Sequence, residues 1–221
     1  AIAGGLLLTA AAPQATISNY YCLLARADIA LAVTLTAVSS LLALVSTPLV
    51  AGIGFAVLLD TQAGFGLPAG KVMQQVVNGL LLPIAAGMFI RHCAPGFVQR
   101  HRLRLRALSL VALAALLTLV LIDQAATIQR HLAMIVTLTT LFTAAAAGIG
   151  FGLARGASWS YSDTITMVSA FPARSLSIAT LIAVNVLGRV EFLSFAVVFF
   201  LVQGVLLAPL MLWARPRAAT P

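Results

Sequence analysis

Long apolar stretches, separated by short charged or Gly/Pro-containing segments, dominate this chain. A helix needs about 20 predominantly apolar residues to cross the hydrocarbon core of a bilayer. By this measure the sequence predicts seven membrane-spanning segments, near residues 1–24, 29–59, 71–90, 107–122, 132–154, 164–187 and 192–213. The stretches are rich in Ala and Leu and lack the alternation of apolar and polar residues that membrane strands show. We therefore expect an all-α membrane protein.

Composition excludes the soluble classes of protein. Hydrophobic residues make up 62% of the chain, charged residues only 8%, and the mean hydropathy is +1.08. Soluble domains carry about 25% charged residues, and disordered chains carry fewer apolar ones. Cys22 and Cys93 have no metal-type spacing, so no metal or other cofactor is expected from them. An intramembrane enzyme would need acids or histidines within the spans, and the five acids lie at predicted loops or interfaces: Asp28, Asp60, Asp123, Asp163 and Glu191.

Basic residues predict how the chain is oriented in the membrane. Alternating the seven segments sorts the loops into two sets, and cytoplasmic loops carry the excess of Lys and Arg. Three basic residues fall in one set: Lys71, Arg130 and Arg189. Nine fall in the other: Arg26, Arg91, Arg100, Arg102, Arg104, Arg106, Arg155, Arg215 and Arg217. We therefore expect an integral protein of the plasma (inner) membrane with a cytoplasmic C-terminus, and with residue 1 outside and preceded by further chain.

The basic run from Arg100 to Arg106 has two interpretations. Clustered cations attract phosphates, so the run could bind nucleic acid or anionic lipid. It lies directly between two predicted spans, however, and has no interleaved aromatic residues on which bases could stack. The pattern favours a plain loop that stops membrane transfer, with membrane lipid around it and no nucleic-acid partner.

Two of the predicted spans are interrupted near their middle. Pro13–Asn19 inserts a proline and polar residues into the first span, and Pro172–Ser175 does the same in the sixth. Proline removes a helix donor and clashes with the preceding turn, so the helices should break there. Each interrupted span is followed by a short charged turn and a long span, and the two units enter the membrane from opposite sides. This pattern is typical of an inverted-repeat transporter, although ordinary proline kinks are the alternative.

The glycine pattern at Gly148, Gly150 and Gly152 resembles a dinucleotide-binding loop only superficially. It lacks the strand before and the helix after the loop that such a motif requires. Glycines at this spacing let membrane helices approach closely, so we expect them to serve helix packing.

Several segments together resemble the bile acid:sodium symporter family. They are Pro13–Asn19, Ala25–Leu31 and Thr34–Ser40, which are similar to the family's broken fourth helix, the turn after it and its fifth helix. Leu81–Ile84 with Gly87 resembles the sixth helix, and Thr164–Ser177 falls where the broken ninth should be. The family has ten helices in two inverted repeats, so seven segments imply that the first three helices are lacking here. The resemblance implies first-repeat core helices over 1–59, panel helices over 60–122 and second-repeat core helices over 123–221, with a broken helix at 164–187.

The resemblance also implies where sodium and substrate would bind. Ser18, Asn19 and Thr36 match positions that hold sodium in the family, through oxygen ligands that suit a hard cation. The acidic and amide positions of the ninth helix are Val168, Pro172 and Ala173 here. Sodium is therefore a possible ligand of the family but not one expected to bind through this residual site.

Arg174 is a basic residue inside a predicted span. Such a group costs on the order of 3 kcal/mol to insert, so it should face protein or water. It could supply a fixed positive charge or bind an anionic substrate through its planar donor fork, and it could also merely pair with unwound carbonyls. The candidate substrate-binding residues are Thr16, Ser18, Asn19, Asn78, Arg174 and Ser175.

The sequence thus predicts a secondary transporter for a small organic anion that works by alternating access. The alternative is a non-transporting sensor or a degenerate paralogue of the same family. A hydrated cavity around Ser18, Asn19 and Arg174 would favour the transporter, because a lapsed site should close with apolar packing. Substrate identity, coupling ion and oligomeric state do not follow from the sequence.

Overall fold

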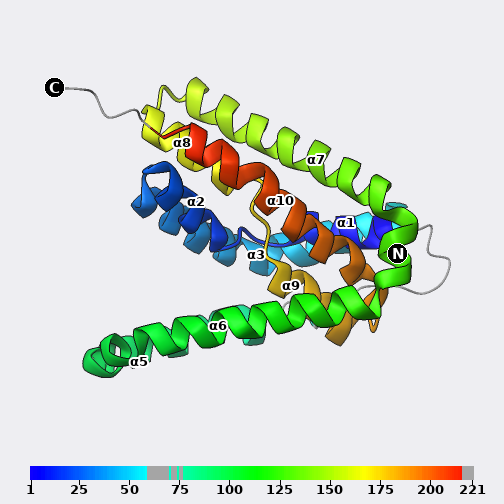
Figure 1. Cartoon of the computed structure of the whole chain (residues 1–221), viewed down its shortest axis with the longest axis horizontal. Helices are drawn as coiled ribbons and strands as arrows, with labels where there is room; N and C mark the ends of the chain where they lie inside the picture. Colours follow the sequence, from blue (N-terminus) through cyan, green and yellow to red (C-terminus); the bar gives the residue numbers. More distant parts are fainter. Residues whose placement is uncertain (59–69, 71–73, 75–76, 216–221) are drawn as a thin grey trace.

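The chain is almost entirely helical. The computed structural model describes residues 1–58, 70, 74 and 77–215, and 87% of these are in helix, with no strand among them. The expectation of an all-α protein is therefore confirmed for the described residues. Figure 1 shows long helices stacked roughly lengthwise, with several shorter ones between them.

Twelve helical elements follow one another along the described chain. The first half contains α1 (Ile2–Ala11), α2 (Ile17–Ala25), α3 (Ile29–Leu58), η1 (Val77–Leu81), α5 (Leu82–Cys93) and α6 (Pro95–Asp123). The second half contains α7 (Ala125–Gly156), α8 (Tyr161–Ala170), α9 (Leu176–Leu181), η2 (Ile182–Val186), η3 (Val190–Phe192) and α10 (Leu193–Trp213).

Among the described residues, fewer than seven helices are long and apolar enough to cross a membrane unaided. Three described helices qualify by length and composition, namely Ile29–Gly54, Ala125–Gly156 and Val190–Trp213. A fourth is added if Pro95–Leu105 and Ala107–Asp123, which bend by 41°, count as one span. Ile2–Ala11 and Leu176–Val186 are apolar but shorter. The third predicted segment begins at residue 71, which lies outside the described residues. The expected boundary between the first core helices and the panel helices, at residues 59 and 60, also lies outside them.

Two helices begin earlier than the hydropathy pattern predicts. α6 starts at Pro95 rather than near residue 107, and α7 starts at Ala125 rather than near residue 132. The basic run from Arg100 is therefore the first part of α6 and not a loop. The physical reason is that Arg, Leu and Gln are good helix formers and that neither Gly nor Pro interrupts the chain from Phe97 to Asp123.

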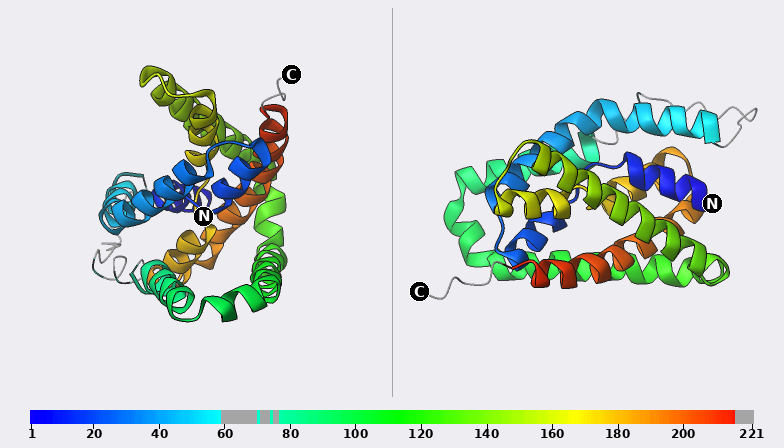
Figure 2. Two further views of the ribbon diagram at one scale, coloured as in Figure 1. Left: turned by 90° about the vertical axis from the view of Figure 1, so that its left-hand side faces the viewer. Right: turned by 90° about the horizontal axis from the view of Figure 1, so that it is seen from above.

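Several of the predicted basic loops lie at the same end of the molecule. In Figure 1 the turns after α2 and α5 and the C-terminal ends of α7 and α10 all lie toward the left, and the right-hand view of Figure 2 agrees. Tyr161 Oη donates a hydrogen bond to Ala214 O at 3.0 Å, and Arg215 Nε donates to Leu24 O. These contacts tie the ends of α2 and α10 to the start of α8. The charge asymmetry read from the sequence thus corresponds to one physical end of the helix bundle.

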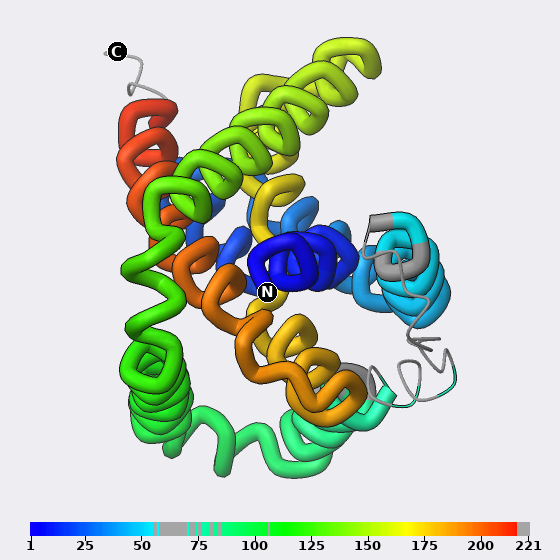
Figure 3. The backbone as a smooth tube through the Cα atoms, turned by 90° about the vertical axis from the view of Figure 1, so that its right-hand side faces the viewer, coloured from blue at the N-terminus to red at the C-terminus, as the bar shows by residue number. Residues whose placement is uncertain are grey.

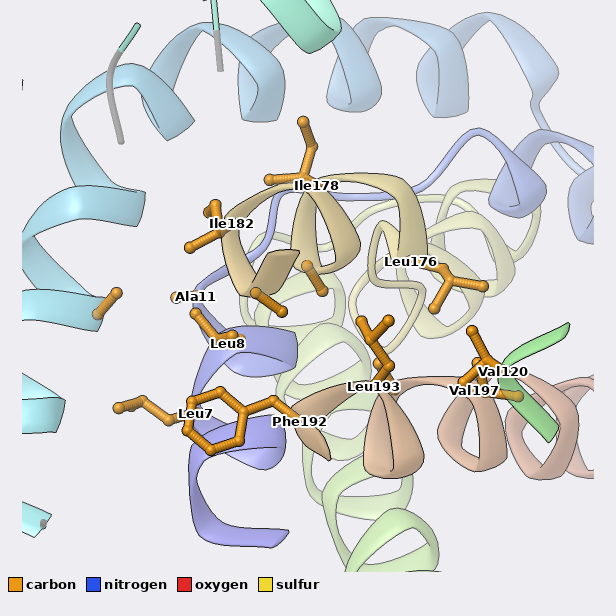
Figure 4. Close-up of a cluster of buried hydrophobic side chains, with 14 residues drawn as sticks. Leu7, Leu8, Ala11, Val120, Leu176, Ile178, Ile182, Phe192, Leu193 and Val197 are labelled. Carbon is orange, nitrogen blue, oxygen red and sulfur yellow. The ribbon is translucent and has the colours of Figure 1, made fainter. Parts of the chain in front are cut away.

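α1 lies in the middle of the apolar core. Figure 3 views it end-on, between α3 and α10, and Figure 4 shows its side chains meeting α9, η3 and α10. Leu8 is 1% exposed and packs in one cluster with Ile182, Leu193 and Val197. A Cβ at Gly5 would lie 2.5 Å from Phe192 O, so this glycine allows α1 to approach the chain at η3 closely. α1 is therefore held by core packing on several sides despite its length of 10 residues.

Gly150 packs α7 directly against the backbone of α8. A Cβ at this position would lie 2.6 Å from Met167 O and 3.3 Å from Phe171 Cδ2. At Gly148 and Gly152, by contrast, an added Cβ would meet no heavy atom within 4 Å. One glycine of the three therefore carries the expected helix contact, and the other two face open space.

We expect Gly150→Ala to lower the melting temperature of the purified protein, because the backbone of α8 must move away from the new methyl group. Overpacking of this kind costs about 1–3 kcal/mol, or about 3–10 °C for a protein of this size. Gly148→Ala is the matched control and should leave the melting temperature unchanged or raise it slightly. Equal melting temperatures for both variants would contradict the packing described for Gly150.

Candidate functional site

The chain between α1 and α2 is extended because proline interrupts it. α1 ends at Ala11, and its C-cap Ala12 has φ −66° and ψ 146°, the conformation favoured for a residue before proline. Pro13 to Ala15 follow without helical hydrogen bonds, and α2 starts at Ile17. Thr47 Oγ1 of α3 donates to Ala11 O at 2.9 Å, which satisfies one of the carbonyls left open at the end of α1.

The chain between α8 and α9 has the same form. α8 ends at Ala170, two residues before Pro172, and α9 restarts with Ser175 as its N-cap. Ser175 Oγ accepts a hydrogen bond from Ile178 N at 3.4 Å. A short polar residue at this position replaces the missing helical partner, as N-caps do.

The two extended segments cross and pair with each other. Ala15 N donates to Ala173 O at 2.9 Å, and Ser175 N donates to Pro13 O at 2.9 Å. Gln14 and Arg174 lie opposite each other in this antiparallel bridge. Backbone groups of the two interrupted helices thus hydrogen-bond to one another. The contact expected between Pro13–Asn19 and Pro172–Ser175 is present.

We expect cysteines at positions 14 and 174 to form a disulfide, because residues opposite each other in such a pair have Cα atoms about 4.5 Å apart. The experiment combines Gln14→Cys with Arg174→Cys in a protein whose native Cys22 and Cys93 are replaced by Ser. Free thiols are counted with a maleimide after oxidation and denaturation. Gln14→Cys with Ser177→Cys is the control, and two free thiols in both proteins would contradict the crossing.

The Gln14 side chain occupies the centre of a polar cluster beside the crossing. Its amide Nε2 donates to Ser18 Oγ at 2.9 Å and to Thr36 Oγ1 at 3.2 Å, and its backbone N donates to Ser39 Oγ at 2.9 Å. The Ser18 and Thr36 hydroxyls in turn donate hydrogen bonds to Ala15 O and Ala32 O, each at 2.9 Å. Both hydroxyls therefore donate and accept a hydrogen bond within the protein.

Asn19 follows Ser18 on α2. Its Oδ1 is buried, and no described residue donates to it. Cys22 Sγ of α2 lies 3.3 Å from Ser169 Oγ of α8, and Thr166 Oγ1 of α8 donates to Asp28 O, in the turn after α2, at 3.1 Å. α8 is thus joined by polar contacts to α2 and to the turn that follows α2.

Arg174 is the basic residue at the crossing. Its Nη1 lies 3.4 Å from Ala12 O, and its Cζ lies 5.8 Å from the centre of the Phe142 ring of α7. Its Nε is buried and has no hydrogen-bond partner among the described residues. The described ion pair of the chain, Arg189 with Glu191, lies elsewhere. The guanidinium is therefore held by a long hydrogen bond and a ring face, with donor capacity left over.

Two hollows flank the crossing. The Arg174 hollow has a volume of about 590 Å³ and is lined by Arg174, Gln14 and Ser39, together with apolar residues of α1 and α3. The Ser175 hollow has a volume of about 400 Å³ and is lined by Gln14, Thr16, Thr36 and Ser175, with Gly79 and Pro83 on the opposite wall. Arg174 and Ser175 open to different hollows because successive side chains of extended chain point to opposite sides.

The structure divides the candidate residues that the sequence treats as one set. Arg174 lines one hollow, whereas Thr16 and Ser175 line the other. Ser18 is fully buried behind the crossing. Asn78 of η1 is exposed and lines neither hollow.

Three residues of the site were missed by the sequence reasoning. Gln14 had a signal, because it is a long polar side chain directly after Pro13, where the helix break was expected. Ser39 lies one turn after Thr36 on the same helix and could have been included on that spacing. Phe142 gave no signal, since one aromatic residue in an apolar helix looks like any core residue.

The side chains here do not fit a sodium ion. Ser18 and Thr36 already hydrogen-bond to the Gln14 amide, which leaves Asn19 Oδ1 as the unpartnered oxygen of the three. The acidic and amide positions are Val168, Pro172 and Ala173, whose side chains carry no oxygen. Sodium takes hard oxygen ligands, and one amide oxygen does not make a coordination shell.

Comparison with known proteins gives two matches. The model of the Sodium Bile acid symporter family matches residues 1–131, which is more than half of the chain. Over 90 residues the chain is 32% identical to "Uncharacterized sodium-dependent transporter YocS" of Bacillus subtilis (strain 168). The aligned part is 41% of this chain and 26% of that relative. The resemblance drawn from the motifs is confirmed, and the chain belongs to the sodium bile acid symporter family, an integral membrane transporter family.

Proposed function

We propose that the chain forms the core of a secondary transporter that moves a small organic anion by alternating access. The observation that carries the proposal is the Arg174 hollow, in which a partly buried guanidinium that makes one long hydrogen bond lines a cavity of about 590 Å³. Cavities of this size hold small molecules. A site that had lost its function would be expected to fill with apolar side chains instead.

The lining of the Arg174 hollow indicates which anion would bind. Arg174 offers a planar fork of donors that matches a carboxylate, with the Ser39 hydroxyl close to the same wall. Away from this end, the lining comes from α3 and is apolar apart from Ser46, with Leu42, Val45 and Leu49 among its residues. The chemistry suits a molecule with one anionic group and an apolar body.

The crossing gives the anion a place between two structural units. α1, α2 and α3 follow each other as helix, break, helix and long helix, and α8, α9 and α10 do the same. We take these units as inverted repeats and α5 with α6 as panel helices that form one wall of the Ser175 hollow. Rocking of the panel against the crossing would open the hollows alternately, as in other inverted-repeat transporters.

Sodium coupling through Ser18, Asn19 and Thr36 is not part of this proposal, because the Gln14 amide already occupies two of those groups. The positive Arg174 beside them would also oppose a cation. We further propose an inner-membrane location with the basic end of the bundle, including the C-terminus, in the cytoplasm. The positive-inside rule and the grouping of basic turns at one end support this orientation.

Counterflow in proteoliposomes tests the transport function. The full-length protein is reconstituted, loaded with one unlabelled organic anion at a time, and presented with the same labelled anion outside. We expect accumulation of at least one carboxylate with an apolar body and none in empty liposomes. Specific binding of such an anion without counterflow would instead support the sensor interpretation.

A further inference from the structure

The turn between α5 and α6 encloses a basic hollow separate from the crossing. It has a volume of about 460 Å³ and is lined by Arg91 at the end of α5 and by Pro95, Val98, Gln99 and Arg102 of α6. A second hollow of about 400 Å³ adjoins Arg91 and is lined by Met88 and His92 as well. Two guanidinium groups from two different helices thus face one cavity.

No described acid forms an ion pair with these two arginines. The sequence contains no Asp or Glu between Asp60 and Asp123, and neither Arg91 nor Arg102 forms an ion pair with a described residue. The N-cap residue of α6, Ala94, makes no side-chain capping bond, and the first turn of α6 holds no acid. The hollow therefore concentrates positive charge and unused donors, which suit a phosphate.

Apolar side chains stand exposed beside the basic ones. Met88 and Phe89 of α5 are 67% and 68% exposed, and Leu103 of α6 is 73% exposed. A free anion would not contact these apolar side chains, whereas the acyl chains of a lipid would cover them. The same turn lies at the basic end of the bundle, where the proposed orientation puts the lipid head groups.

We propose that Arg91 and Arg102 bind the phosphodiester of an anionic phospholipid in the cytoplasmic leaflet, with Gln99 as a further donor. Basic pockets beside membrane helices on the cytoplasmic side bind such head groups. The site does not depend on transport at Arg174, because it lies entirely in the hairpin of α5 and α6. It would anchor the tip of this hairpin to the membrane surface.

Native mass spectrometry of the detergent-solubilised full-length protein tests the lipid site. Phosphatidylglycerol and phosphatidylcholine with the same acyl chains are supplied in equal amounts, and we expect phosphatidylglycerol to remain bound preferentially. Arg91→Gln combined with Arg102→Gln should weaken its binding by about 30-fold, because the binding contributions of two arginines at an anionic surface are lost together. Inorganic phosphate at millimolar concentration should displace the lipid only weakly.

Arg100→Gln combined with Arg104→Gln is the matched control. It removes the same charge from the opposite side of α6, because two residues correspond to about 200° around a helix. We expect this variant to keep its phosphatidylglycerol. Equal loss in both double variants would overturn the site in favour of general charge attraction. Displacement by phosphate with no preference between the lipids would overturn the lipid as its ligand.

Discussion

Replacing Arg174 with Ala should abolish anion uptake while the protein still folds. The guanidinium makes one long hydrogen bond to Ala12 O, so its loss costs the fold little. A bound carboxylate, in contrast, would lose its charged partner in a partly buried cavity, and truncating one member of such a pair costs 2–5 kcal/mol or more. We expect the initial rate in proteoliposomes to fall by more than about 30-fold, which is the lower end of that range.

Two controls separate this effect from a general loss of charge or fold. Arg130→Ala removes an exposed arginine from the start of α7 and should leave uptake unchanged. Ala32→Ser adds a hydroxyl one helical turn before Thr36, beside the residual sodium-site positions, and should also do little. Uptake by Arg174→Ala at the wild-type rate would show that the anion is held elsewhere.

Much of the fold could be predicted from the sequence because its strongest signals are local. Pro13 and Pro172 each prevent the helix before them from continuing, and the chain leaves the helical conformation at both expected places. The starts of α6 and α7 were misplaced because hydropathy reports where a helix meets lipid, whereas Arg and Gln continue the helix beyond that point. The pairing of Gln14 with Arg174 follows from the two breaks only if the inverted repeat is assumed.

The candidate site could be predicted less well because its contacts join distant parts of the chain. Arg174 was singled out by its charge, but its neighbour Phe142 lies on another helix and carries no local signal. Thr16 and Ser175 were grouped with Arg174 because all three fall in the two helix breaks, although in the structure Thr16 and Ser175 line the other hollow. The role of Gln14 depends on a side-chain rotamer, which composition and spacing do not determine.

Uptake should be equally fast in sodium and in potassium media, because the Gln14 amide takes the place of a cation at the crossing. Its Nε2 donates to Ser18 Oγ and Thr36 Oγ1 at 2.9 and 3.2 Å, so one lone pair of each oxygen is already taken by the amide instead of an ion. The measurement is the initial rate of labelled anion uptake with each cation at the same ionic strength. A rate that rises several-fold with sodium would contradict the proposal, and its persistence in Arg174→Ala would point to backbone carbonyls as ligands.

Gln14→Ala extends the same argument to the side chain itself. Without the amide, the Ser18 and Thr36 hydroxyls keep the hydrogen bonds that they donate but each loses the one that it accepts, and a lost hydrogen bond costs about 0.5–1.5 kcal/mol. We expect a lower melting temperature and slower uptake, by the same factor in sodium as in potassium, because Val168, Pro172 and Ala173 still supply no oxygen. Gln129→Ala, on the exposed side of α7, is the matched control and should change neither. If sodium, and not potassium, restored the uptake rate of Gln14→Ala, then Ser18, Asn19 and Thr36 would bind the ion once the amide is removed. This result would contradict the proposal.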